Sequence, residues 1–263
     1  MATSHALSRL HHVRAPVVRR IGVQDLRDAL RRGLDDFQAM PTHAILVVVL
    51  YPVIGVFFAR IAFGYDLLPL LFPLMAGFAL IGPFAALGLY ELSRRRELGL
   101  GTEWSDAMAA FRAPAIRSIL LLGFLLAALL VLWVFTADAI YRALFGATAP
   151  ESVGAFFGAV LGTGRGWALI LIGNAVGFLF AAAALAISVV SFPLLLDRDV
   201  GAATAVETSL RAVRENPVPM ALWGLIVAGL LVLGSLPLFV GLAVVLPLLG
   251  HATWHLYRKV VDS

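Results

Sequence analysis

Two histidines near the C-terminus, His251 and His255, have a spacing that could support metal chemistry. They lie four residues apart, so on a helix both imidazoles share one face and could bind the same metal ion. His43 is expected at a similar membrane depth. A third ligand is expected from one of three acids: Glu91, Asp197 or Asp199. The alternative is that the histidines lie at the membrane interface and donate hydrogen bonds to headgroups or helix-end carbonyls.

A second group combines acids with arginines and consists of Glu91, Asp197, Arg198 and Asp199. Such a cluster could form a cytoplasmic gate or docking site. The simpler explanation, which we favour, is a solvated helix end, because exposed ion pairs are common and weak. Glu91 differs from the others because it follows an apolar stretch. It is expected partly inside the helix bundle, where an ionisable residue is a functional candidate.

Several chemistries have no residues to support them. The chain has no cysteine, which excludes disulfides, zinc thiolate sites and iron-sulfur clusters. It also lacks a glycine-rich phosphate loop, an H-E-x-x-H helix and a G-x-S-x-G elbow. We therefore expect no enzyme activity and no cofactor. The net charge of +4 indicates membrane topology rather than nucleic-acid binding.

The elements that must position these residues are membrane helices. With 61% hydrophobic residues, 14% charged residues and a mean hydropathy of +0.93, the chain is far from the composition of a soluble domain. Long apolar runs without alternation predict an all-α, polytopic membrane protein. Six transmembrane helices are expected, at about 43–58, 67–92, 118–137, 167–194, 218–234 and 238–257.

The distribution of basic residues predicts the orientation. Of the 20 lysines and arginines, 17 lie on the side of the expected spans that holds both termini. This bias predicts a multi-pass protein of the bacterial inner membrane with cytoplasmic N- and C-termini. Residues 1–21 are expected to form a mobile cytoplasmic tail, and residues 22–263 a single membrane domain.

Three cytoplasmic stretches precede the first, third and fifth expected spans, and each has the apolar spacing of an amphipathic helix. The apolar residues are Leu30, Leu34 and Phe37 in the first, Trp104, Met108 and Phe111 in the second, and Val206, Leu210 and Val213 in the third. A small residue lies within each set: Gly33, Ala107 or Ser209. Three interfacial helices are expected, and the chain divides into three units, about 22–97, 98–199 and 200–263, each with one surface helix and one hairpin.

The fourth expected span is rich in small residues. Gly173 and Gly177 let helices approach closely, and the amide of Asn174 can bridge two helices. These three residues are therefore predicted to serve helix packing.

Three phrases resemble a known family: "IGPFAALGLYELSRRRELG", "VVSFPLLLDRDVGAATAVETSLRAVRENP" and "LGHATWHLYRKV". They are similar to those of predicted bacterial integral membrane proteins grouped as DUF2189, over about 18–261. The resemblance implies a multi-pass inner-membrane protein. Some relatives carry the label of a cytochrome c oxidase subunit. A catalytic oxidase core is not expected, because none of the six histidines is placed at mid-membrane to hold haem or copper.

Taken together, these features favour a non-enzymatic scaffold, assembly or interaction factor in the bilayer. One alternative is a transporter or channel for a small or lipidic solute. Another is a metal-binding or accessory protein of a respiratory oxidase, which would use His251, His255 and His43. The expected partners are the lipid bilayer and other membrane proteins. The sequence leaves the oligomeric state open.

Overall fold

The computed structural model describes residues 16–40, 55, 65–147, 150–237 and 240–262. Within these ranges the chain forms helices and no strand, and its one β-type contact is an isolated antiparallel bridge between Val18 and Val261. The prediction of an all-helical chain is confirmed. The first expected span, 43–58, and His43 lie outside the described residues.

Three helices are long and apolar enough to cross a membrane, judged by length and composition. They are α6 (Ile116–Phe145), the stretch Gly164–Asp197 formed by α8 (Gly164–Ser188) and α9 (Ser191–Asp197), and α11 (Pro217–Ser235). These correspond to the third, fourth and fifth expected spans. At 30 residues, α6 continues eight residues beyond its expected end.

The second expected span is not one helix. It consists of η2 (Tyr65–Leu70), α3 (Leu71–Phe78), η3 (Ala79–Ile81), α4 (Gly82–Ala85) and α5 (Leu87–Glu97). Prolines cause the interruptions, because a proline ring clashes with the carbonyl four residues earlier and has no N–H to donate. Pro83 has no N–H to donate to the carbonyl of Ala79, and the chain forms the 3-10 turn η3 at that point instead of a continuous α-helix.

A proline also explains the bend in the fourth span. We expected bends at Pro193 and Gly177. The break falls at Val189 and Val190 between α8 and α9, and Val189 is the residue whose carbonyl Pro193 cannot satisfy. The helix continues through Gly177 without interruption.

The last helix, α12 (Leu242–Val260), covers the sixth expected span but is not among the candidate membrane helices. Its C-terminal half carries two histidines, Arg258 and Lys259, and is buried in protein. Six spans are thus not confirmed by the described residues.

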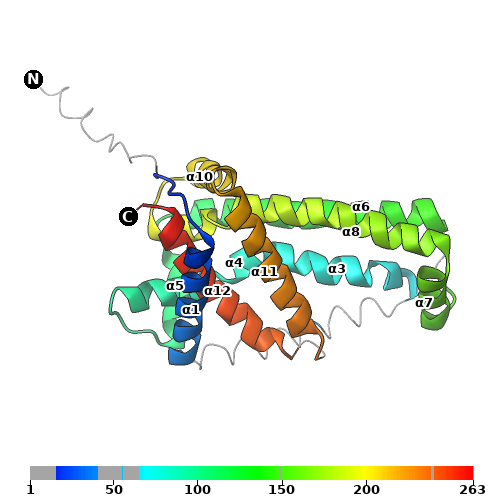
Figure 1. Ribbon diagram of the computed structural model, residues 1–263, viewed down its shortest axis with the longest axis horizontal. Helices are drawn as coiled ribbons and strands as arrows, with labels where there is room; N and C mark the ends of the chain where they lie inside the picture. Colours follow the sequence, from blue (N-terminus) through cyan, green and yellow to red (C-terminus); the bar gives the residue numbers. More distant parts are fainter. Residues whose placement is uncertain (1–15, 41–54, 56–64, 148–149, 238–239, 263) are drawn as a thin grey trace, which may run out of the picture.

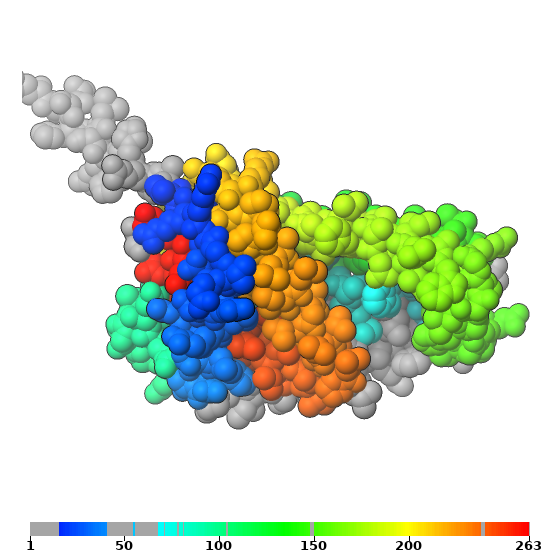
Figure 2. Space-filling view, in the orientation of Figure 1, coloured from blue at the N-terminus to red at the C-terminus, as the bar shows by residue number. Residues whose placement is uncertain are grey.

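The long helices and the polar helices occupy different parts of the molecule (Figure 1). Helices α6 and α8 lie side by side along the long axis, and α7 (Val153–Gly162) lies at one end of them. At the other end, α1 (Val23–Ala39) packs closely on α12, and α12 also contacts α5. Figure 2 shows the same division, with α1 and α11 adjacent on the near face and α8 extending past them.

Small residues set the close helix contacts. A Cβ on Gly33 of α1 would lie 2.6 to 2.7 Å from backbone and Cβ atoms of Ala252, so α1 meets α12 almost backbone to backbone. Similarly, Gly77 lets α3 approach Trp133 of α6. The Trp133 indole N–H donates to the Pro73 carbonyl over 2.8 Å and fixes that contact.

The three expected surface segments are helical: α1, η4 (Trp104–Arg112) and α10 (Ala202–Glu215). The middle one is a 3-10 helix. None of the large residues in the predicted apolar sets is fully buried among those described. The buried residues are mostly small, namely Ala29, Gly33, Ala110, Ala205, Ser209 and Ala212, together with Leu26, Asp36 and Thr208. The larger residues Leu34, Met108 and Phe111 are exposed, as an interfacial helix requires.

Residues 16–21 are held against the C-terminus and against Asn216, at the start of α11. The Arg19 N–H donates to the Val260 carbonyl over 2.7 Å, and the Asp262 N–H donates to Val17 over 3.0 Å. The buried Asn216 side chain accepts from the Ile21 N–H over 2.8 Å. We expected residues 16–21 to belong to a mobile tail, and these contacts instead hold them against the rest of the protein.

Candidate functional site

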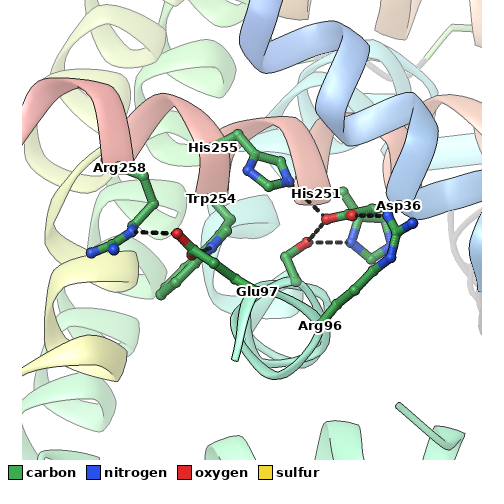
Figure 3. A network of polar contacts seen from close by, with 8 residues as sticks. Asp36, Arg96, Glu97, His251, Trp254, His255 and Arg258 are labelled. Carbon is green, nitrogen blue, oxygen red and sulfur yellow. Dashed lines mark hydrogen bonds and ion pairs between the residues drawn. The ribbon is translucent and has the colours of Figure 1, made fainter. Parts of the chain in front are cut away.

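The most elaborate polar arrangement lies where α1, α5 and α12 meet, and it is centred on Asp36 (Figure 3). One carboxylate oxygen of Asp36, Oδ2, lies 2.6 Å from Ser93 Oγ and 2.8 Å from His255 Nε2. The other oxygen, Oδ1, accepts from Arg96. Ser93 Oγ also lies 2.8 Å from His251 Nδ1. We call Asp36, Ser93, Arg96, His251 and His255 the Asp36 junction.

The arrangement defines where its protons lie. An ionised carboxylate only accepts hydrogen bonds, so Ser93 and His255 must both donate to Asp36. Ser93 then has no second proton, and His251 Nδ1 must donate to the serine oxygen. His255 therefore carries a proton on Nε2 and His251 on Nδ1. His255 thus binds the Asp36 carboxylate directly, and His251 binds it through the Ser93 hydroxyl.

The charge on Asp36 is stabilised although the side chain is only 5% exposed. Burial alone would raise the pKa of this carboxyl. Hydrogen bonds from His255 and Ser93, the charge of His255 and the hydrogen bond from Arg96 outweigh burial and lower the pKa from 3.8 to about 2. Asp36 is consequently an anion at neutral pH, held by partners from two other helices.

The predicted metal residues are placed differently from expectation. His251 and His255 do share a helix face, and this face is buried against α1 and α5, where the imidazoles contact Ser93 and Asp36. Neither Glu91 nor Asp197 contributes to the contacts described for the pair. Across the described part of the chain, no group of three or more His, Cys, Asp or Glu side chains is arranged to hold a metal ion.

Glu91 and Asp197 lie in a second polar region, next to the Asp36 junction. Glu91 is 1% exposed and binds Arg94 through two hydrogen bonds of 2.8 and 2.9 Å, as expected for an acid inside the bundle. Asp197 Oδ2 accepts from the Tyr257 hydroxyl over 2.6 Å and lies 3.7 Å from Arg258. The Glu91 hydrogen bond, and then the charges of Glu91 and Asp197, raise the pKa of Arg94. Asp197 is thus a partly buried member of this polar network.

The other two residues of that predicted cluster differ from each other. Arg198 donates to the Asp262 carbonyl and its Nε lies 3.5 Å from Asp197 Oδ2, whereas Asp199 is exposed. Only Asp199 fits the solvated helix end that we favoured. Glu97 extends the network to the surface, because this exposed carboxylate accepts from the Trp254 indole over 3.1 Å and from Arg258 over 3.1 Å.

This difference gives a paired prediction. Replacing Asp197 by asparagine removes the negative charge between Arg258 and Arg94, and we expect the free energy of unfolding to fall by about 1 kcal/mol. Replacing Asp199 by asparagine should change it by less than about 0.5 kcal/mol. Denaturant titration in detergent micelles measures both. Equal effects of the two changes would contradict the assignment of Asp197 to the polar network.

The three residues predicted for helix packing also separate. Gly177 packs on α6, where an added Cβ would lie 3.0 Å from the Trp133 ring. A Cβ on Gly173 would meet no atom within 4 Å. Asn174 is exposed, and its amide N–H donates to its own helix at Ile170 over 2.7 Å. Of these three residues, only Gly177 packs against another helix.

Sequence reasoning did not identify Asp36, Ser93 and Arg96 as site residues. One signal was available. Leu26, Ala29, Gly33 and Asp36 are spaced 3, 4 and 3 residues apart, so any helix that buries the first three also buries Asp36. A carboxylate on a buried face requires donors from its neighbours.

The comparisons with known proteins concern the middle of the chain. A family model described as "Predicted integral membrane protein (DUF2189)" matches residues 71–197. The match spans α3 to α9, including Glu91 and Asp197. It leaves α1 and α12 outside, and with them Asp36 and both histidines. No curated protein and no solved structure matches the chain. The match supports the resemblance to the DUF2189 family of predicted integral membrane proteins over residues 71–197, which is about half of the chain and less than the range of about 18–261 that we expected.

Proposed function

We propose that this protein is a non-enzymatic scaffold, assembly or interaction factor that works within the bacterial inner membrane. One observation carries the proposal. The charged and polar groups gathered at the end of the bundle bind one another rather than surround an open site: Asp36 with His255, Glu91 with Arg94, and Asp197 with Tyr257. Such a region holds helices in place and leaves no reactive group poised for a substrate.

The outward surface supports the same proposal. Large apolar side chains are exposed along the three candidate membrane helices: Phe124 and Phe135 on α6, Leu171 and Phe178 on α8, and Leu225 and Leu233 on α11. In a bilayer these faces contact lipid or the apolar helices of other proteins. A hydrogen-bonded polar end together with broad apolar faces suits a protein that binds other membrane proteins.

The packing order supports the proposed six spans in three units. Each surface helix contacts the last helix of another unit, in a cycle: α10 packs on α8 and α9, η4 on α5, and α1 on α12. In each case the small residue within the predicted apolar set makes the contact. The pairs are Ser209 with Val190, Ala107 with Gly88, and Gly33 with Ala252.

Equivalent charged positions support the cycle further. A charged residue follows each contact residue by six or seven positions: Arg94 follows Gly88, Asp197 follows Val190, and Arg258 follows Ala252. Asp197 interacts with both arginines. A cyclic arrangement of three hairpins brings such positions together at its centre. An experimental structure in lipid in which α12 or residues 43–58 stayed out of the bilayer would contradict six spans.

The proposed orientation places both termini in the cytoplasm. It rests on the excess of lysine and arginine on one side of the spans, and the pairing of Val18 with Val261 is consistent with both ends on the same side. A reporter that is active only in the cytoplasm should therefore be active when it is fused after Ser263, and one that is active only in the periplasm should not.

The experiment that tests the scaffold role uses the full chain, tagged at its N-terminus and extracted in native-lipid discs. We expect a defined membrane partner at constant stoichiometry. That partner should also be retained by the Asp199→Asn variant, whose change lies at an exposed position outside the network. Reconstituted liposomes provide the contrast. Solute flux that depends on the protein, with no partner at fixed stoichiometry, would contradict the proposal in favour of a transporter.

A further inference from the structure

The exposed amide of Asn174 needs a partner within the membrane. Asn174 is the tenth residue after Gly164, where α8 begins, so it lies about 15 Å along the helix. The hydrocarbon core is about 30 Å thick, which places Asn174 near its middle. Arg165 and the exposed Trp167 at the start of α8 are suited to the membrane interface and support this depth.

The hydrogen bonding of this amide is incomplete. Its N–H donates to the Ile170 carbonyl, but among the described residues no group donates to its carbonyl oxygen. Lipid chains have no donors, so the cost of the unpaired oxygen persists unless another helix supplies one. The opposite face of α8 cannot do so, because Val176, Gly177 and Phe180 are already packed inward.

The surroundings of Asn174 allow another helix to approach. The exposed face of α8 combines small residues with two larger apolar ones: Leu171, Asn174, Ala175, Phe178, Ala181 and Ala182. Alanines bring helix backbones close enough for a short amide side chain to reach across.

We propose that α8 forms a twofold contact with α8 of a second copy of this chain, joined by an Asn174–Asn174 amide pair. Two copies inserted with the same orientation hold Asn174 at the same depth, so a twofold axis along the membrane normal places the two amides opposite each other. An amide is both donor and acceptor, so each can supply the donor that the other lacks. This self-association does not depend on the proposed scaffold role.

The absence of cysteine makes a direct test available. A single cysteine at Ala175→Cys should form a disulfide-linked dimer on mild oxidation in native membranes. Leu225→Cys is the matched control, because Leu225 is 65% exposed on α11 and lies about 12 Å from the start of that helix. A yield at Ala175→Cys no higher than at the control, or a cross-link to a different protein, would overturn the proposal.

The role of the amide is tested by the monomer–dimer equilibrium in liposomes, followed by single-molecule fluorescence. Asn174→Leu should raise the dimer dissociation constant about tenfold, and Asn174→Gln should largely restore association. Both variants should keep the unfolding transition of the monomer, because the side chain contacts only its own helix. An unchanged dissociation constant in Asn174→Leu, or a monomeric wild-type protein, would refute the amide pair whether or not a scaffold partner exists.

Discussion

Replacing Asp36 by alanine should lower the free energy of unfolding by about 3 kcal/mol, which is a large effect for one residue. The change removes the acceptor of two buried donors, Ser93 and His255, and leaves them without the partner that Asp36 supplied. Arg96 adds little to the loss, because its side chain is 41% exposed and water can solvate it. Reversible unfolding in detergent micelles measures the difference.

The neighbouring residue provides a matched control. Asp35 has the same charge as Asp36 and lies on the same helix, but its side chain is exposed. Asp35→Ala should therefore change the free energy of unfolding by less than about 0.5 kcal/mol. If Asp35→Ala and Asp36→Ala gave equal losses, the effect would come from helix charge rather than from the Asp36 junction.

The acid sensitivity of the Asp36 contribution has a definite sign. The pKa of Asp36 is lower in the folded protein, about 2, than its ordinary value of 3.8. A lowered acid pKa stabilises the fold above the ordinary value, and the contribution is lost as pH falls from about 4 to about 2. The shift corresponds to about 2 kcal/mol. Asp36→Ala should therefore flatten the stability profile in that window, and an unchanged profile would contradict the low pKa.

The sequence predicts the membrane helices well where apolar runs are uninterrupted. Helices α6 and α11 and the stretch Gly164–Asp197 follow the expected spans, because hydrocarbon length and hydropathy suffice to define them. Between Tyr65 and Glu97 hydropathy alone predicts one span. The prolines within that run divide it into short helices, so backbone chemistry overrides hydropathy there.

The polar site was predictable only in part, for a physical reason. Spacing shows that His251 and His255 share a face, but it does not show which helix covers that face. The partner, Asp36, is 215 residues away from His251 in the chain, and only the α1–α12 contact brings them together. Spacing within a helix predicts local neighbours, whereas contacts between helices depend on small residues such as Gly33, whose importance is visible only in the packed structure.

That contact leads to the second large effect. Gly33→Val should lower the free energy of unfolding by about 3 kcal/mol, because a side chain there meets backbone atoms of Ala252 at 2.6 and 2.7 Å, and backbone cannot move aside as a flexible side chain can. The α1 and α12 helices must separate, which also lengthens the 2.8 Å contact between Asp36 and His255. Gly229→Ala on α11 is the control. A Cβ there meets nothing within 4 Å, and alanine favours a helix over glycine by about 1 kcal/mol, so this variant should be at least as stable as the wild type. Because the Asp36 junction depends on the same contact, Gly33→Val combined with Asp36→Ala should cost less than the two separate losses added together. Full additivity would mean that the close approach of α1 to α12 and the polar junction stabilise the protein independently.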